Sequence, residues 1–447
     1  MVRLPFRRRA VAVATAALSL LAVAACDAKG ASSDAAGSCA PSGGKVTLSF
    51  WNWVPGMADA VKLWNSKNPD IQVDLRTVPA GNAGTYQNMF NAIKAGNAPD
   101  LGQVEYDSLA SFRLADGLAD IGGCAGVKDG GAKFVDWTWR QVSFGSTDSV
   151  FGIPQDIGPL ALYYRKDLFD KYGIAPPATW DEYYQAAKKL KQAAPGTVIT
   201  HFSQTDPNWF TGLLWQNGAR LFTEQGDAWK VTVDTPQTQQ VADFWQKMID
   251  EKLVATDLQG FSAALYKAWN DGSVATWISA PWGYSIIRDN APASAGKWAV
   301  APLPQWSAGG QKVGNWGGSS TAVFKSSKHR YEAAKFALWL DSDPEALAIL
   351  NAKGGQYAAA LAGQQLPALT EPVPYYGGQK IFDVFKTAAG QVDVDFTWGP
   401  TMTDTYRFMS DGISGALGGS GNLRGTLTST QQKTVYSLKS QSLKVTG

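Results

Sequence analysis

The chain has 447 residues, of which 40 are Lys or Arg and 38 are Asp or Glu, so its formal net charge is only +2. Proteins that bind nucleic acid usually present a strongly basic face, and this balance gives no sign of one. There are only two His and three Cys, and no Cys-x-x-Cys spacing occurs. The sequence therefore predicts no metal site, no cofactor and no nucleic-acid partner.

The first 26 residues have the pattern of a bacterial export signal. Four Arg precede an apolar run over residues 10–25, which is shorter than the about 20 apolar residues that a membrane-spanning helix needs. The run ends in Val-Ala-Ala-Cys at residues 23–26, which resembles a lipobox, so Cys26 is expected to carry a diacylglycerol after cleavage. An ordinary signal peptide with a chance Cys is the alternative. Both the Sec and the twin-arginine export routes stay open.

Cleavage before Cys26 would leave a mature chain with a different charge and a flexible start. Residues 1–25 hold four Arg and no acid, so their loss changes the formal net charge to −2. Residues 26–44 are rich in Ala, Ser and Gly and predict a flexible tether. The remaining pair, Cys39 and Cys124, favours a disulfide in an exported chain, with two free thiols as the alternative. A mature length of roughly 400 residues predicts two domains.

Strands and helices are expected to alternate after the tether. Apolar and polar residues alternate at 46–50 and 71–75, a short apolar strand is expected at 101–104, and helices are expected around Trp64 and over 85–94. This order implies a parallel sheet with helices on its faces. Ligands of such sheets bind outside the carboxyl ends of the strands.

A second set of elements begins at Gly152. Thr179 and Glu182 fit a capping box at the start of a helix that is expected to continue to about Ala193. The other expected elements are strands at 160–164, 273–278, 299–301 and 321–324, a helix at 331–340, and a mainly helical tail after Pro344.

Five segments carry a resemblance to a known family. They are 95–101 (Ala-Gly-Asn-Ala-Pro-Asp-Leu), 152–158 (Gly-Ile-Pro-Gln-Asp-Ile-Gly), 163–169 (Tyr-Tyr-Arg-Lys-Asp-Leu-Phe), 177–182 (Pro-Ala-Thr-Trp-Asp-Glu) and 315–320 (Asn-Trp-Gly-Gly-Ser-Ser). In this order they resemble the family 1 extracellular solute-binding proteins, the group that includes maltose-binding protein. The resemblance extends over nearly the whole mature chain.

This resemblance implies an α/β fold of the type II periplasmic-binding-protein class. Each of two lobes would be a mostly parallel sheet flanked by helices, with a cleft between the lobes. The implied crossings lie near Gln155, near 302–304 and near Ala346. Lobe one would then hold residues 45–155 plus 305–345, and lobe two residues 156–304 plus 346–447. Ligand-driven closure of the lobes is hinge motion.

The sequence holds eighteen Trp, and seven of them fall in predicted loops or at the ends of elements. An indole ring covers the apolar C–H face of a sugar, and amides and carboxylates bind its hydroxyl rim. Glycine lets a backbone approach closely. The candidate ligand-binding residues are Trp51, Asn52, Trp53, Tyr106, Asp107, Gln155, Asp156, Trp209, Trp215, Trp282, Tyr284, Asn315, Trp316, Gly317, Gly318 and Trp398. The alternative is core packing for each Trp and a solvated cap or turn for each acid. Trp64, Trp180, Trp245 and Trp339 fall on predicted helix faces and are assigned to packing.

The expected function is that of a monomeric, lipid-anchored receptor outside the cell. It would capture a mono- or oligosaccharide and deliver it to the permease subunits of an ABC importer. One alternative is an exported glycan-acting enzyme that uses Asp107 and Asp156 as its carboxylate pair. Another is a binding protein for a cationic or peptide solute. His201, expected at a strand end, and His329, expected at a helix start, lie in no catalytic motif.

Overall fold

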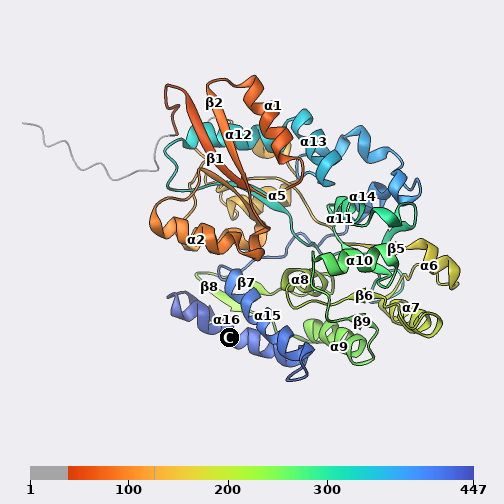
Figure 1. Cartoon of the computed structure of the whole chain (residues 1–447). Coiled ribbons are helices and arrows are strands. Elements are labelled where there is room, and N and C mark those ends of the chain that lie inside the picture. The colour runs from red at the N-terminus through yellow and green to blue at the C-terminus, as the bar shows by residue number, and fades with distance from the viewer. Residues whose placement is uncertain (1–38, 125, 447) are drawn as a thin grey trace, which may run out of the picture. The chain divides into compact units, whose positions relative to one another are not determined.

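The structure, a computed structural model, describes residues 39–124 and 126–446 (Figure 1). The predicted signal, the lipidation site Cys26 and most of the tether lie outside these residues. Within the described ranges no helix is both long enough and apolar enough to cross a membrane. The same part of the chain holds no group of three His, Cys, Asp or Glu side chains arranged for a metal ion.

The first sheet has the strand order β2-β1-β3-β12-β4. Its strands are β1 (Val46–Asn52), β2 (Ile71–Thr77), β3 (Leu101–Glu105), β4 (Gly152–Pro154) and β12 (Ser319–Val323). β1 pairs in parallel with β2 and β3, and β12 runs antiparallel to both β3 and β4. The sequence predicted the parallel part because helices separate those three strands.

Helices cover the first sheet on both faces. They are α1 (Met57–Lys67), α2 (Thr85–Ala95), α3 (Tyr106–Leu114), α5 (Asp136–Ser143), α12 (Arg330–Ser342) and α13 (Pro344–Gly354), with a short α4 (Val127–Gly130). Figure 1 shows α1 and α12 beside β1 and β2. Phe336 of α12 packs edge-on against Phe50 of β1 at 5.6 Å and against Trp64 at 5.3 Å. α13 packs on α1 and α12.

The second sheet has the order β10-β5-β11. Its strands are β5 (Ala161–Arg165), β10 (Thr276–Ser279) and β11 (Trp298–Pro302). Both pairs are antiparallel, which differs from the mostly parallel sheet expected in lobe two. β5 is antiparallel to β10 and β11. The chain enters β5 directly from β4 of the first sheet, with no helix between the two strands. β6 (Thr200–His201) and β9 (Val254–Ala255) form a parallel pair. A parallel bridge between Val198 and Val274 joins the segment before β6 to the segment before β10.

The remaining helices surround the second sheet and a small third sheet of order β13-β8-β7. The helices are α6 (Lys166–Lys171), α7 (Trp180–Ala193), α8 (Pro207–Gln216), α9 (Pro236–Asp250), α10 (Ala263–Asp271), α11 (Gly283–Asn290), α14 (Ile381–Ala389), α15 (Met402–Leu417) and α16 (Leu423–Ser440). The strands of the third sheet are β7 (Phe222–Gln225), β8 (Ala228–Val231) and β13 (Lys444–Thr446). α16 packs on α15, α9 and β8.

Only the Thr179 half of the predicted capping box of α7 is present, because Glu182 bonds the amide of Ala178 and not that of the N-cap residue Thr179. The Thr179 side chain accepts a hydrogen bond from Glu182 N at 3.2 Å. The Glu182 carboxylate accepts from the backbone N–H of Ala178 at 2.7 Å. Amides at a helix start lack partners within the helix, so these bonds fix where α7 begins.

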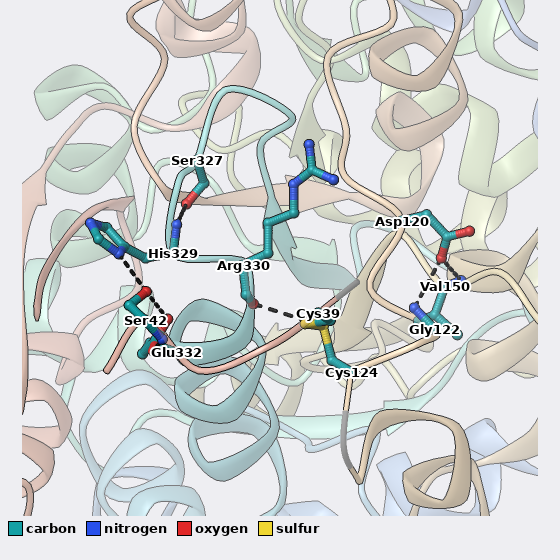
Figure 2. Close-up of a disulfide and its surroundings, with 10 residues drawn as sticks. All are labelled: Cys39, Ser42, Asp120, Gly122, Cys124, Val150, Ser327, His329, Arg330 and Glu332. Carbon is teal, nitrogen blue, oxygen red and sulfur yellow. Dashed lines mark hydrogen bonds between the residues drawn. A yellow bond between two sulfur atoms is a disulfide. The ribbon is translucent and has the colours of Figure 1, made fainter. Parts of the chain in front are cut away.

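A disulfide joins Cys39 to Cys124, with their Cα atoms 4.9 Å apart (Figure 2). Close by, Ser42 N donates to the Glu332 carboxylate at 2.6 Å, and the Ser42 hydroxyl contacts the same carboxylate at 3.0 Å and His329 Nδ1 at 2.9 Å. His329 is the residue before α12, as the sequence predicts. These contacts attach the start of the described chain to α12.

Candidate ligand-binding site

Four aromatic side chains meet beside β10 and the start of β12. Trp277 belongs to β10, Trp282 precedes α11, Trp316 lies just before β12, and Phe261 precedes α10. The Trp282 and Trp316 ring centroids are 4.7 Å apart, and the Phe261 ring lies 6.0 Å from each. Phe261 is 44% exposed and has φ 57°, whereas Trp316 is only 3% exposed. Trp282 is half-buried, so this cluster offers aromatic surface to a ligand.

Gly317 lies between this aromatic cluster and the end of β3. Its φ is 75°, and a Cβ at this position would lie 3.5 Å from Trp282 Nε1 and 3.8 Å from Glu105 Oε1. Trp282 Nε1, from the segment after β10, and Glu105 Oε1, at the end of β3, thus both lie within 4 Å of this Cβ position. Glycine has no Cβ and leaves the position open. At Gly318, with φ 87°, a Cβ would come within 3.0 Å of the Tyr106 ring.

Replacing Gly317 by Ala is expected to weaken ligand binding at least tenfold in a calorimetric titration, because the new methyl group occupies the point that Trp282 and Glu105 face. Gly419→Ala is the matched control. Gly419 has the same φ of 75°, but no atom lies within 4 Å of its Cβ position. Both variants carry similar backbone strain. Equal affinity losses in the two would show that strain, and not the ligand, is responsible.

Three acidic side chains gather at the ends of β3 and β4. Tyr86 Oη donates to Glu105 Oε2 at 2.9 Å. The Asp107 carboxylate accepts from Tyr406 Oη at 2.9 Å and from Ser108 Oγ at 2.8 Å. Asp156 Oδ1 accepts from Ser319 N at 2.8 Å.

Burial raises the pKa of each acid in this group. Burial, reinforced by the charge of Asp107, raises the pKa of Glu105 to about 8. Burial raises the pKa of Asp107 to about 6 and that of Asp156 to about 7, against the hydrogen bonds that each accepts. Carboxylates so placed resist ionising together.

The second sheet contributes one more acid, which the sequence did not single out. Asp206 precedes α8 without a side-chain capping bond, and a Cβ at Gly260 would lie 2.1 Å from Asp206 Oδ2, so the carboxylate lies against the turn that carries Phe261. Burial raises the pKa of Asp206 to about 7 and lowers that of His201 to about 4. His201 Nε2 lies 4.0 Å from Asp206 Oδ2.

These shifts predict that the unliganded protein loses stability as the pH rises from 6.5 to 8. Glu105, Asp156 and Asp206 have folded-state pKa values of about 7 or 8, above those of unfolded carboxyl groups, so the folded chain binds more protons. The lowered pKa of His201 makes stability rise with pH, but only below the ordinary His pKa of 6.5, which lies at the bottom of this window. The expected loss is about 1–3 kcal/mol, seen as a falling melting temperature. Glu105→Gln should reduce the slope, and a melting temperature that rises over this window would contradict the account.

Several candidate residues make structural contacts instead of facing the aromatic cluster. Trp209 Nε1 donates to Ile278 O at 3.0 Å, and Trp215 Nε1 donates to Asp393 O at 2.9 Å. Trp398 packs edge-on against Trp215 at 5.6 Å. Asn315 uses its side chain fully, since Oδ1 accepts from Gly158 N at 2.8 Å and Nδ2 donates to Gly317 O at 2.7 Å.

The strand-end candidates of the first sheet are largely enclosed. Asn52 Oδ1 accepts from Val54 N at 2.7 Å, and the Gln155 side chain is fully buried. Trp51 lies under the Arg76 guanidinium at 4.9 Å, and Trp53 packs edge-on against Tyr86 at 6.0 Å. Tyr106 Oη donates to Asp156 O at 3.1 Å. Of this group, Tyr106 bonds Asp156 directly, and Trp53 reaches Glu105 only through Tyr86.

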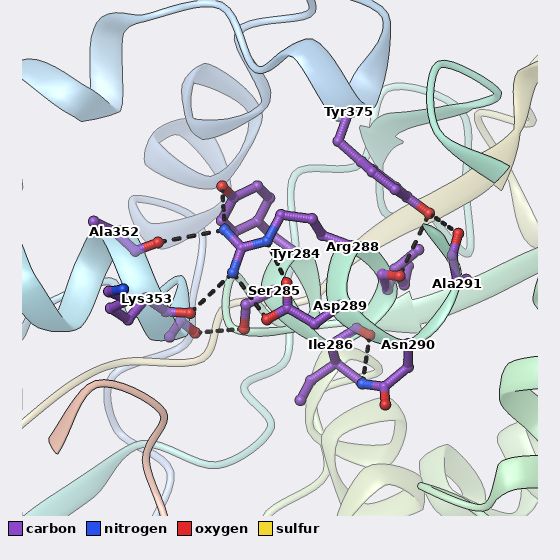
Figure 3. A network of polar contacts seen from close by, with 12 residues as sticks. Tyr284, Ser285, Ile286, Arg288, Asp289, Asn290, Ala291, Ala352, Lys353 and Tyr375 are labelled. Carbon is purple, nitrogen blue, oxygen red and sulfur yellow. Dashed lines mark hydrogen bonds and ion pairs between the residues drawn. The ribbon is translucent and has the colours of Figure 1, made fainter. Parts of the chain in front are cut away.

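Tyr284 belongs to a polar network at the end of α13 (Figure 3). Arg288 Nη1 donates to Tyr284 Oη at 2.7 Å and to Ala352 O at 3.3 Å, and Nη2 donates to Lys353 O at 3.1 Å. A guanidinium at a helix C-terminus satisfies carbonyls that have no partner within the helix. Tyr284 therefore helps to hold α11 against α13.

A cavity of about 1020 Å³ lies between α3 and α5 on one side and β7, β8 and residues 394–400 on the other. It shares only Tyr106 and Trp398 with the candidate residues, and it also contains Arg113, Arg140 and Trp229. Arg113 lies over the rings of Phe144 at 4.6 Å and Phe151 at 4.8 Å.

The structure also adds candidate site residues that sequence reasoning did not include: Glu105, Asp206, Phe261, Trp277 and Tyr406. Glu105 could have been found, because it ends a predicted strand directly before Tyr106 and Asp107. Phe261 and Tyr406 carry no local signal, since only the fold brings them to the same place.

Comparison with known proteins identifies the family of this chain. Residues 52–347 match the bacterial extracellular solute-binding proteins. An arabinooligosaccharide-binding protein of Bacillus subtilis is 27% identical over 317 residues, which are 68% of this chain and 70% of that protein. A lactose-binding protein of Rhizobium radiobacter is 24% identical, covering 76% of this chain and 81% of that protein.

Two solved structures are similar over 90% of this chain and the whole of their own. The galacto-N-biose/lacto-N-biose I-binding protein of Bifidobacterium longum is 29% identical with a TM-score of 0.80. An ABC-transporter-associated binding protein of B. animalis subsp. lactis, solved with β-1,6-galactobiose, is 26% identical with a TM-score of 0.81. The predicted type II two-lobed fold is thereby confirmed. The chain belongs to the family of bacterial extracellular solute-binding proteins.

Proposed function

We propose that the protein is the sugar-binding receptor of an ABC-type importer and holds a mono- or oligosaccharide between its lobes without altering it. The observation that carries this proposal is the Trp282–Trp316–Phe261 cluster, which faces Glu105 across Gly317. Aromatic rings cover the C–H face of a sugar, and the carboxylate and indole N–H bond its hydroxyls. Four of the relatives and similar structures described above are named for, or solved with, saccharides.

The proposed ligand is enclosed by closure of two lobes. We take lobe one as residues 45–155 plus 305–345 and lobe two as 156–304 plus 346–447, with α13 packed on lobe one at the third crossing. Tyr406 of α15 bonds Asp107 of α3, and Ser111 Oγ donates to Pro400 O at 3.0 Å. A ligand that touches both lobes only when they are closed binds the closed state better and shifts the population toward it.

The proposed location is the outer face of the cell membrane, with a lipid on Cys26. The tether expected at residues 26–44 is shorter at its far end, because the Cys39–Cys124 disulfide and the Ser42 contacts attach residues 39–42 to the fold. Permease subunits of an importer are the expected partners, and the protein is expected to act as a monomer. Mass spectrometry of the membrane fraction tests the anchor: a diacylglycerol-modified Cys26 supports it, and an N-terminus created elsewhere contradicts it.

The test of function is a calorimetric titration of the mature protein with a panel of mono- and oligosaccharides, followed by product analysis. Saturable binding with the saccharide recovered intact supports a receptor. Cleaved glycan would instead favour the enzyme alternative with Asp107 and Asp156. In that case the hydroxyl of Tyr406 and the amide of Ser319, which now bond these acids, would have to release them.

A further inference from the structure

Among the described residues, the carboxyl groups beside Gly317 and the one beside the Phe261 turn form no ion pair with a Lys or Arg. Glu105, Asp107 and Asp156 bond only hydroxyl or amide groups. The titratable groups that interact with these acids are neutral or acidic: Tyr86 from α2, Tyr406 from α15, Asp341 from α12 and Tyr106 from α3. No Lys or Arg is among the described groups that shift the pKa values of these acids.

The acid beside the Phe261 turn repeats this pattern. Asp206 is 7% exposed, and its nearest titratable neighbour is His201, whose lowered pKa keeps it neutral. The His201 ring is 6% exposed and faces Asp206, and its Nδ1 has no hydrogen-bond partner among the described residues. Of the two Arg of the neighbouring cavity, Arg113 is held over two Phe rings and Arg140 lies 3.8 Å from the Asp136 carboxylate. A buried polar group without a partner points to a ligand or water that completes it.

Unpaired carboxyl groups of this kind favour a cation. A neutral hydroxyl can donate to a carboxylate but leaves its charge uncompensated in a poorly hydrated place. An ammonium group supplies three donors and a balancing charge, and its hydrogen bonds to a carboxylate are about twice as strong as neutral ones. Aromatic ring faces within about 6 Å attract the same cation. The rings of Trp316 and Phe261 lie beside Trp282, at 4.7 Å and 6.0 Å, and Trp282 presents its Nε1 edge to the point at Gly317.

We propose that the ligand of this site is a saccharide that carries a protonated amino group, held at Gly317 against Glu105 and Trp282. This inference rests on the proposed function and names the class of sugar. The Glu105 carboxylate accepts from the ammonium, Trp282 Nε1 donates to a neighbouring ring hydroxyl, and the rings of Trp316 and Phe261 cover the sugar.

This arrangement has a measurable consequence beyond affinity. Without ligand, Glu105, Asp156 and Asp206 are partly protonated near neutral pH, because burial raises their pKa values. An arriving ammonium stabilises the ionised carboxylates, so binding releases protons to solvent. Affinity for the amine is therefore expected to rise from pH 5 to pH 7. A neutral sugar of the same shape gives no such release.

The test compares three β-1,4-linked disaccharides that differ only at carbon 2: di-glucosamine, its N,N′-diacetyl form and cellobiose. Calorimetry in two buffers of different ionisation enthalpy measures affinity and proton release together. We expect at least tenfold tighter binding of the diamine, with proton release. Glu105→Gln should remove most of that preference, while Asp148→Asn, an exposed acid paired with Lys128, should leave it unchanged.

The outcomes separate the inference from the proposed function. Equal or tighter binding of the acetylated or neutral disaccharide overturns the inference and leaves the receptor intact. The same holds if none of the three binds but another neutral saccharide of the panel does. If no saccharide binds, the proposed function itself fails.

Discussion

Replacing Trp282 by Ala is expected to weaken saccharide binding by about 2–4 kcal/mol, the size of a hot-spot truncation. Trp282 is the half-buried member of the aromatic cluster, and its indole N–H faces the open point at Gly317. The substitution removes a stacking surface and a donor from the ligand, while few core contacts are lost. Titration calorimetry measures the change in affinity.

Trp339→Ala is the matched control for Trp282. Trp339 of α12 is also half-buried, but it packs against Trp64 of α1 at 5.1 Å, in the contact between those two helices. The control should lower the melting temperature about as much as Trp282→Ala and leave affinity unchanged. Trp316→Ala is a less clean test, because a 3% exposed Trp also supports the core. Unaltered affinity in Trp282→Ala would show that the aromatic cluster does not bind the saccharide.

Removing the disulfide is expected to cost about 2–5 kcal/mol of stability without changing saccharide affinity. Cys39 and Cys124 are 85 residues apart in sequence, and a cross-link that closes a long loop restricts the unfolded chain strongly. The double variant Cys39→Ala/Cys124→Ala should therefore melt at a lower temperature. The binding site is unaffected because the bond lies beside α12 and not between the sheets.

Two comparisons control this prediction. Ser42→Ala keeps the disulfide and removes only the hydroxyl contacts with Glu332 and His329, so its loss of stability should be much smaller. Adding a reductant to the unaltered protein should reproduce the double variant. A double variant that is as stable as the parent chain would show that the Cys39 segment contributes nothing to the fold.

The sequence predicted the first sheet well because its signals are local. The alternation of apolar and polar residues predicts β1 at 46–50 and β2 at 71–75, and Gly96 predicts the end of α2. The crossing near 155 is a prediction from the resemblance. The reversed direction of β5 was missed, since strand direction depends on where the chain comes from and not on the residues of the strand.

The candidate site has local signals only in part. The strand end at Glu105 and the glycine at 317 carry such a signal, and Glu105 and Trp282 both lie within 4 Å of a Cβ position at Gly317. The sequence predicts loop positions for Trp209 and Trp215, but Pro207 is the first residue of α8, which contains both. Inside that helix their indole N–H groups bond carbonyls of other segments. Asp206 and Phe261 come together only through tertiary packing, which no single segment encodes.

A crystal structure of the mature protein with a saccharide from the binding panel tests the central claim most directly. We expect the sugar ring to lie against Trp282 and Trp316, with a polar group within hydrogen-bond distance of Glu105 and contacts from both sheets. A saccharide bound instead in the cavity between α3, α5 and the β7–β8 hairpin, with the Gly317 point empty, would contradict the account.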